Sequence, residues 1–316
     1  MNDRTLVVGE ALVDIVHRTD GTVEEHPGGS PLNVAIGLAR LGHHVHYAAR
    51  FGDDLRGHTI RAHLEREPNI TLTRGTASAP STSTATATLD ERGAATYEFD
   101  LTWDVANALD GEPTGHVHTG SIAATLAPGA DAVLEVARRG HETGTVSYDP
   151  NARPTLMGDP ATALERVEAV AANADVVKAS DEDIAWFYGA TTDATGTIEV
   201  DDAMRRFAEL GASLVVITRG DAGCRVYVAG TGEWADVPPV ENVIVMDTVG
   251  AGDSFMAGLI SGLLDAGLLG SADARAALAA ADLDAIMPAV TRANVCAAVT
   301  VSRAGANPPT RAELPS

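Results

Sequence analysis

The run DTVGAGDSFMAGL, residues 247–259, decides how this chain of 316 residues is interpreted. Apolar residues recur at helical spacing from Phe255 onward, so we expect a helix that begins at Ala251 and buries one face. The small residues Gly250, Ala251 and Gly252 let the backbone N–H groups of a turn approach an anion closely, and the start of a helix is the positive end of its dipole. The stretch therefore predicts an anion site at a helix N-terminus.

A carboxylate stands inside that predicted anion site, because Asp253 directly follows the three small residues. Phosphate oxygens would repel Asp253 unless it has a chemical task, and the natural task is to accept a proton from a hydroxyl that attacks phosphorus. The structural alternative is an ordinary glycine-rich helix start in which Asp253 offsets the helix dipole. The short motif alone leaves both interpretations open.

Two long signatures resemble those of the ribokinase (PfkB) family of carbohydrate kinases. Residues 247–255 are similar to the family's C-terminal signature, D-T-x-G-A-G-D-x-F, and PGGSPLNVAIGLARLG, residues 27–42, resembles its N-terminal signature. The sequence FGDD, residues 51–54, follows in the expected place. The resemblance implies that Asp253 and the turn before it are catalytic. Shorter matches extend it over essentially the whole chain, at residues 179–181, 218–220 and 303–308.

Strand-like and helix-like segments alternate along the chain, which favours a single α/β domain over residues 1–316. We expect a ribokinase-like three-layer sandwich, in which helices cover both faces of a mostly parallel central sheet and ligands bind beyond the carboxyl ends of its strands. The predicted strands are residues 6–8, 45–49, 117–120, 146–148, 175–178 and 214–217, with a hairpin near 224–236. The predicted helices are residues 32–41, 54–67, 129–139, 160–172 and 201–210, with two more that begin at 251 and at about 288.

The threonine-rich segment 82–99 breaks this rhythm and predicts a β-hairpin with its turn at residues 90–93. An isolated hairpin is marginally stable, so we expect it to pair with residues 15–23. A plain surface hairpin is the alternative, but the resemblance implies a small β lid over the sugar, formed by about 13–26 and 80–102. The outer face of this lid is expected to be apolar and to join two subunits in a homodimer, through Val16, Ala85, Ala87 and Leu89.

Composition excludes several classes of partner. The chain has 44 acidic and 22 basic residues and a formal net charge of −22, which argues against nucleic acid and anionic membranes. Its two cysteines, Cys224 and Cys296, are too few for a disulfide framework or a zinc site, so we expect reduced thiols and a cytoplasmic location. Charged and turn residues interrupt every apolar run, and we expect neither a leader nor a membrane span.

The resemblance implies a set of sugar-binding residues. Asp14 and Asn33 match positions that face sugar hydroxyls, which suits groups that accept and donate hydrogen bonds. The D-x-N-x-R run at residues 149–153 is similar to fructokinases and to 2-keto-3-deoxygluconate kinases, whose acidic substrate would need cationic or hydroxyl groups such as Arg153, Tyr97 and Arg92. The predicted sugar-binding residues are Asp14, Gly28, Gly29, Asn33, Tyr97 and Arg153.

A second set of residues is assigned to the nucleotide by the same resemblance. Thr218 and the glycines after it match positions near the ribose and phosphates, and the two asparagines match the adenine side. The sequence contains no Walker A run, and Gly250-x-Gly252 lacks the third glycine of a dinucleotide fingerprint. The predicted ATP-binding residues are Lys178, Ser180, Thr218, Gly220, Gly223, Asn294 and Asn307.

The expected metal ions are Mg²⁺ with ATP and a monovalent cation such as K⁺. The family often has Asn-x-x-Glu where this chain has Ser180 and Asp183, so Mg²⁺ contact by Asp183 is expected through water. Asp247 lies in the loop that can hold the monovalent cation.

These observations predict an ATP-dependent sugar kinase in which Asp253 takes the proton from a primary hydroxyl. D-Fructose is the expected acceptor, and 2-keto-3-deoxygluconate is the alternative. A nucleoside kinase would need aromatic residues to stack on a second base, and aromatics make up only 4% of the chain. A non-catalytic binding protein on the same fold would have no need of a carboxylate beside phosphate.

Overall fold

A nine-stranded sheet forms the centre of the computed structural model, which describes residues 4–89, 95–109, 115–189 and 200–315. The strand order is β13-β12-β11-β10-β9-β8-β1-β4-β5, and all neighbours are parallel except the pairs that β12 makes with β11 and β13. The strands are β1 (Thr5–Val8), β4 (Val45–Ala48), β5 (Ile70–Leu72), β8 (His116–Gly120), β9 (Thr145–Asp149), β10 (Val176–Ser180), β11 (Leu214–Thr218), β12 (Cys224–Val228) and β13 (Glu233–Val237).

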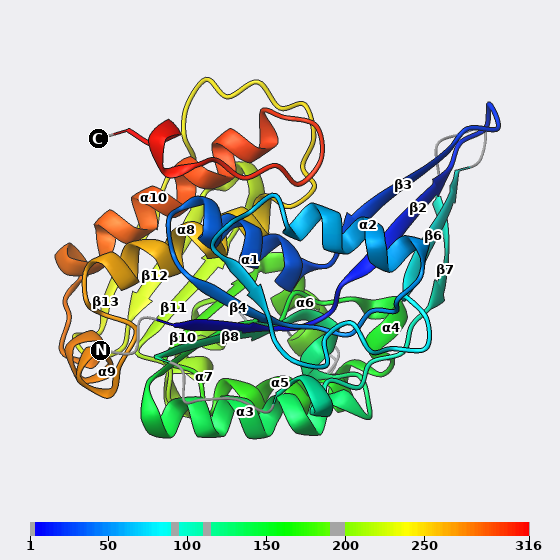
Figure 1. The fold of residues 1–316 in the computed structure, drawn as a ribbon. Helices are drawn as coiled ribbons and strands as arrows, with labels where there is room; N and C mark the ends of the chain where they lie inside the picture. Colours follow the sequence, from blue (N-terminus) through cyan, green and yellow to red (C-terminus); the bar gives the residue numbers. More distant parts are fainter. Residues whose placement is uncertain (1–3, 90–94, 110–114, 190–199, 316) are drawn as a thin grey trace.

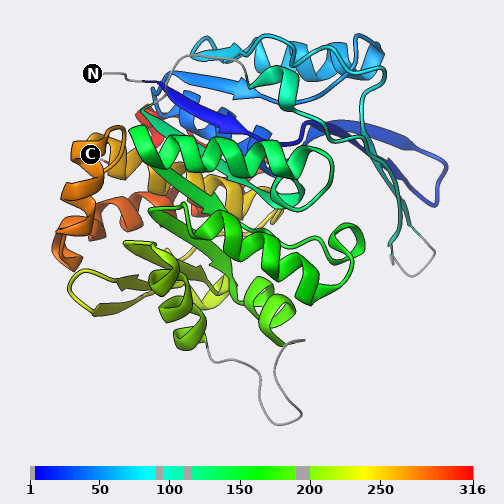
Figure 2. The same ribbon diagram turned by 90° about the horizontal axis from the view of Figure 1, so that it is seen from below.

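Helices cover both faces of this sheet, as Figures 1 and 2 show, so the expected three-layer α/β sandwich is confirmed. One face carries α1 (Ser30–Arg40), α8 (Ala251–Asp265) and α10 (Leu283–Val301). The other carries α3 (Gly129–Thr143), α5 (Pro160–Ala171) and α7 (Val200–Leu210). The remaining α-helices in the described ranges are α2 (Leu55–Leu64), α4 (Pro154–Met157), α6 (Asp181–Gly189) and α9 (Ala272–Ala279).

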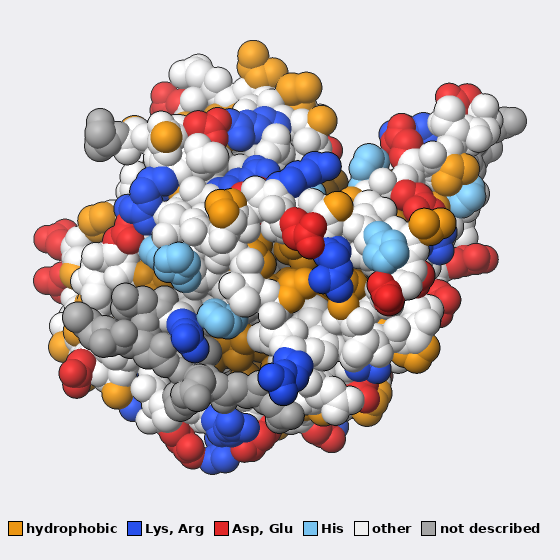
Figure 3. All heavy atoms as spheres, in the orientation of Figure 1, with side chains coloured by type: hydrophobic (Ala, Val, Ile, Leu, Met, Phe, Trp, Pro, Cys, Tyr) orange, Lys and Arg blue, Asp and Glu red, His pale blue; other side chains and the backbone are white. Residues whose placement is uncertain are grey.

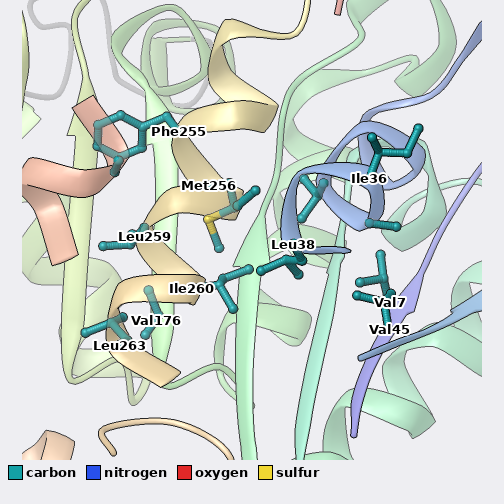
Figure 4. Close-up of a cluster of buried hydrophobic side chains, with 14 of the residues drawn as sticks. Val7, Ile36, Leu38, Val45, Val176, Phe255, Met256, Leu259, Ile260 and Leu263 are labelled. Carbon is teal, nitrogen blue, oxygen red and sulfur yellow. The ribbon is translucent and has the colours of Figure 1, made fainter. Parts of the chain in front are cut away.

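Two apolar cores lie on the two faces of the sheet, because successive strand residues point to opposite sides. Val176 of β10 packs in the core beneath α8, whereas its neighbour Val177 packs in the core beneath α5. Figure 4 shows Ile260 of α8 beside Leu38 of α1, and both side chains are fully buried. Burial of each such side chain stabilises the fold by about 1.5–3 kcal/mol, which fixes α8 and α1 against one another.

Helix α10 begins earlier than predicted. It starts at Leu283 rather than near residue 288, because the side chain of Asp282 caps it by accepting a hydrogen bond from the Ala285 amide at 3.0 Å. Pro288 lies inside the helix. The sequence pattern also failed to predict β5, α6 and α9.

A second, four-stranded sheet projects from the body of the molecule (Figure 1). Its order is β3 (Val23–Gly28), β2 (Leu12–His17), β6 (Thr84–Leu89) and β7 (Ala95–Asp100), with β2 and β6 parallel. The predicted pairing of the hairpin with the segment around residues 15–23 is therefore confirmed. The predicted turn at 90–93, which includes Arg92, lies outside the described residues.

The two faces of the small sheet differ from the expectation. Strand register sets Asp14 opposite Ala85, and Ala85 opposite Phe99, so these residues share one face, and all three line a cavity. By the same register Val16 and Ala87 share this face with Ala85, so these three residues belong to the inner face and not to the outer face expected for them. On the opposite face Val13 and Ile15 are buried against the body. The side chain of Leu89 lies outside the described part of the chain.

The surface carries both signs of charge. Figure 3 shows both acidic and basic side chains over one face of the molecule. Within the described ranges, no helix combines the length and apolar character needed to cross a bilayer.

Candidate active site

A cavity of about 570 Å³ lies where the carboxyl ends of the central strands, the small sheet and the start of α8 meet. Strands β1 and β8 are neighbours in the sheet. The next central strand after β1 is β4, on one side of this pair, and the next after β8 is β9, on the other side, so the strand order reverses between β1 and β8. Open parallel sheets bind ligands at such a point. The polar residues that line the cavity include Glu10, Asp14, Ser30, Asn33, Tyr97, Ser121, Asn151, Arg153, Lys178 and Asp253.

The predicted anion turn forms one wall of this cavity. Gly250 is the N-cap of α8 in the left-handed region, with φ of 74°, and a Cβ atom there would lie 2.5 Å from that of Ala306. The first helical hydrogen bond runs from the Ser254 amide to the Gly250 carbonyl at 2.8 Å, so the amides of Gly252 and Asp253 have no acceptor within the helix. Amides in this position bind anions well.

The carboxylate of Asp253 is buried and held from two sides. The Ser30 hydroxyl donates to Oδ1 at 2.6 Å, and the Asn33 side-chain amide donates to Oδ2 at 2.8 Å. Both donors come from the first turn of α1, and both line the cavity with Asp253. The arrangement fixes the carboxylate at the anion turn, where it can accept a proton from a hydroxyl in the cavity. Ser30 was not predicted as a site residue, although it lies within the N-terminal signature.

Lys178, the only lysine of the chain, lies beneath the anion turn. Its Nζ donates to Oδ2 of buried Asp149 at 2.8 Å and lies 3.2 Å from the point where a Cβ of Gly252 would stand. Burial would lower the pKa of Lys178, but the carboxylates around it, chiefly Asp149, outweigh burial and raise it. Burial raises the pKa of Asp149 to about 6. Both groups are therefore charged at pH 7, and Lys178 supplies a positive charge behind the turn.

The small sheet supplies the opposite wall. Burial raises the pKa of Asp14, against the opposing effects of Arg153 and His26. Gly28 and Gly29 are packed closely here: a Cβ on Gly28 would lie 2.0 Å from Oδ2 of Asp14. The ring of Tyr97 stacks on that of Phe99 and lines the cavity, although the residue is 57% exposed.

The loop after β9 contributes Arg153, but its guanidinium turns back on its own loop. Its Nη1 donates to Oδ1 of Asn151 at 2.7 Å and to the carbonyl of Ala152 at 2.9 Å. Two further cavity residues were missed in the sequence. Glu10 follows β1 and Ser121 follows β8; only their places after strands could have signalled them.

The residues predicted to bind the nucleotide are spread more widely. Thr218 ends β11, and Gly220 and Gly223 follow it at the same rim, outside the cavity lining. Asn294 donates to the carbonyl of Pro238 at 3.2 Å, and Oδ1 of Asn307 accepts from Arg40 at 2.6 Å. The nucleotide roles of these residues remain predictions.

The predicted metal-binding carboxylates already accept backbone hydrogen bonds. Asp183 accepts from the amides of Ala152 at 2.7 Å and Ser180 at 2.8 Å, and the Ser180 hydroxyl accepts from the Asp183 amide, as in a capping box. Asp247 accepts from the amides of Val249 and Gly305, and these bonds lower its pKa. No cluster of three or more His, Cys, Asp or Glu residues suited to a metal ion occurs in the described ranges. The metal roles remain predictions.

A three-layer α/β sandwich with an anion turn, a held carboxylate and an adjoining polar cavity fits an enzyme that transfers a phosphoryl group to a small molecule. The chain matches the family model described as pfkB family carbohydrate kinase over residues 2–313, and it belongs to that family. It is 32% identical to a fructokinase of Klebsiella pneumoniae over 319 residues, which covers 97% of this chain and 95% of the relative.

Solved structures show the same architecture. A double mutant of the fructokinase from Vibrio cholerae O395, with fructose, ADP and a potassium ion bound, is 26% identical with a TM-score of 0.78; the match covers 96% of this chain and 94% of that one. The aminoimidazole riboside kinase of Salmonella enterica, with aminoimidazole riboside and an ATP analogue, is 25% identical with a TM-score of 0.74. The match covers 96% of this chain and 95% of that one.

The buried ion pair leads to a prediction about stability. Lys178→Met leaves the buried Asp149 carboxylate unpaired, so we expect the free energy of unfolding to fall by about 3–5 kcal/mol. The double variant Lys178→Met/Asp149→Leu removes both charges and should regain most of that loss, because apolar replacement of a buried pair is often nearly neutral. Urea denaturation of the two variants measures the difference, and equal stabilities would contradict this account.

Proposed function

We propose that this carbohydrate kinase is an ATP-dependent fructokinase, which transfers the γ-phosphoryl group of ATP to the primary hydroxyl of D-fructose and gives fructose 6-phosphate. The observation that carries the proposal is the Asp253 carboxylate, held by two donors beside the free amides of the anion turn. The fructokinase of Klebsiella pneumoniae, similar over nearly the whole chain, supports fructose as the acceptor.

The geometry supports a separate role for each group of residues at the site. Ser30 and Asn33 orient the Asp253 carboxylate, which accepts the proton as the sugar hydroxyl attacks in line. Because the transition state of phosphoryl transfer is loose, the hydroxyl need not be deprotonated early, and an aspartate can serve. The amides of the turn and the Lys178 ammonium behind it stabilise charge on the transferred group.

The alternatives have weaker support. A 2-keto-3-deoxygluconate kinase needs cationic groups for its acidic substrate, yet the guanidinium of Arg153 donates to its own loop. A non-catalytic binding protein would leave the held carboxylate of Asp253 unexplained. The aminoimidazole riboside kinase shares the fold, but its identity to this chain, 25%, is lower than the 32% of the fructokinase of Klebsiella pneumoniae.

We also propose that Mg²⁺ accompanies ATP. The ion keeps several waters and is commonly bound by substrate phosphates and one or two carboxylates, which fits a site with no ready-made cluster in the described ranges. Asp183 would then contact it through water, and the loop of Asp247 would hold a monovalent cation such as K⁺. When bound, Mg²⁺ would neutralise phosphate charge. Turnover that persists in excess EDTA would contradict the Mg²⁺ assignment.

The small sheet is proposed to act as a lid of a single 1–316 domain, formed by about 13–26 and 80–102, and to pair with a second copy. It projects from the body, and its inner face lines the cavity near Asp14 while Tyr97 remains exposed. Closure over the sugar would exclude water that otherwise hydrolyses ATP. We also propose a cytoplasmic location, because ATP is available there and thiols such as that of Cys224 stay reduced. Fractionation of the native cells tests this location.

The substrate assignment predicts the outcome of a sugar panel. In a coupled assay of ATP turnover with added Mg²⁺, we expect kcat/KM for fructose to exceed those for ribose and for 2-keto-3-deoxygluconate. The cavity offers carboxylates and amides that suit hydroxyl groups and few free cations for an acid. A tenfold preference for the keto acid would replace the fructokinase assignment with the alternative.

The role of Asp253 predicts a loss of turnover without a loss of binding. Asp253→Asn keeps the size of the side chain but removes the proton acceptor, so we expect kcat to fall by about 10²–10⁴-fold. Fructose and ATP should still bind, as measured by calorimetry. Asp273→Asn, on the exposed face of α9, is the matched control and should retain full activity. Unchanged kcat in Asp253→Asn would overturn the mechanism.

The lid proposal predicts a dimer in solution. Light scattering should give twice the chain mass, and Ala87→Glu should lower it, because Ala87 is partly buried on the inner face of β6, through which the two lids are proposed to pair. Thr88→Glu adds the same charge on the opposite face of that strand and is expected to remain dimeric. A monomeric wild type would refute pairing through the lid while leaving the kinase assignment intact.

A further inference from the structure

Glu10 occupies the point of the fold at which a ligand is most expected, yet the mechanism above does not use it. It lies two residues beyond the end of β1, and Ser121 lies one residue beyond the end of the adjacent strand β8. These two strands flank the reversal of strand order. Both residues line the cavity that contains Asp14 and Asp253.

The backbone around Glu10 is fixed on several sides. The buried Tyr47 hydroxyl donates to the Glu10 carbonyl at 2.8 Å, and the Gly9 amide donates to the carbonyl of Ala48 at 3.1 Å. Gly29 packs so closely that a Cβ there would lie 2.4 Å from the Glu10 carbonyl oxygen. The residue as a whole is only 6% exposed, so its side chain is kept inside.

One oxygen of the Glu10 carboxyl group lacks the hydrogen-bond partner that its burial demands. This atom, Oε2, is buried and accepts no hydrogen bond from the described residues. A buried acceptor without a partner is costly, and native structures rarely keep one without a reason. The nearby cation does not supply the bond, because the Arg153 guanidinium donates to Asn151 and Ala152. A hydroxyl of a bound ligand would satisfy the orphaned oxygen.

On the basis of the proposed function, we propose that the Glu10 carboxylate accepts a hydrogen bond from a sugar hydroxyl other than the one that is phosphorylated, and thereby determines which sugars are accepted. Asp14 would contact the sugar from strand β2 of the small sheet, and Glu10 would contact it from the end of β1. An analogue that lacks the hydroxyl would leave Oε2 unpaired. Sites built to bond a hydroxyl reject such analogues strongly.

Substrate analogues and Glu10 variants together test this contact. We would measure kcat/KM of wild type, Glu10→Gln and Glu10→Ala with fructose and with its 1-deoxy, 3-deoxy and 4-deoxy analogues. Wild type should discriminate against one analogue by about 10²-fold or more. In Glu10→Ala that discrimination should fall below about tenfold, while discrimination against the other two analogues stays as in wild type. Unchanged discrimination, or an equal loss for all four sugars, would overturn the proposal.

A matched control separates recognition from stability. Asp175 is another buried carboxylate, but it lies before β10, at the opposite end of the strand from the cavity, and accepts from the Val146 amide at 2.7 Å. Asp175→Asn should lower thermal stability without altering the discrimination. No turnover of fructose by wild type would overturn the proposed function together with this contact. Normal fructose turnover with unaltered discrimination in Glu10→Ala would overturn the contact alone.

The pH profile provides an independent readout. Burial raises the pKa of Glu10 to about 7, with Ser121 and Arg153 opposing the shift and Asp253 adding to it; the Tyr47 phenol also faces the carboxyl. The acceptor is the ionised form, so kcat/KM for fructose should fall as pH drops below about 7. This limb should be absent in Glu10→Gln. A Glu10→Gln profile identical to that of wild type would contradict the proposal.

Discussion

The hydrogen bonds from Ser30 and Asn33 to Asp253 join two helix starts that lie more than 200 residues apart in the sequence. Helix α1 begins without a side-chain cap and without acidic residues in its first turn, and α8 begins at a left-handed glycine. The positive ends of both helices therefore meet at one carboxylate. That meeting point requires α1 and α8 to be packed together, which their shared apolar core achieves (Figure 4).

This constraint explains how a strongly acidic chain can hold an anion. The net charge of −22 repels nucleotides at long range, so attraction must be local. The single lysine is placed behind the turn and paired with Asp149, and most arginines of the described ranges form ion pairs with carboxylates, as Arg206 does with Glu168. Backbone amides and helix ends are thus left as the main positive groups at the phosphate side of the cavity.

The sequence predicted the layers, most strands and a carboxylate at the N-terminus of a helix beside a glycine-rich turn, because periodicity and turn chemistry are local properties. It misplaced the start of α10, because the cap that Asp282 forms lies upstream of the predicted start. It did not reveal Ser30 as a donor to Asp253, because that contact depends on tertiary packing. The inner face of the small sheet was misassigned for the same reason: alternation identifies two faces of a strand but not which one lines the cavity, as Ala85 does.

Glu10 shows why buried polar groups are hard to foresee from sequence. In the sequence it is one of 44 acidic residues, and nothing in its neighbours separates it from the solvated majority. Its distinction arises only when β1 and β8 pair and the reversal of strand order brings their ends together. A fold that buries an unpaired carboxyl there gives up stability. A sugar hydroxyl that donates to this carboxyl regains the lost free energy on binding. Ligands that carry the hydroxyl are therefore bound more tightly than ligands that lack it.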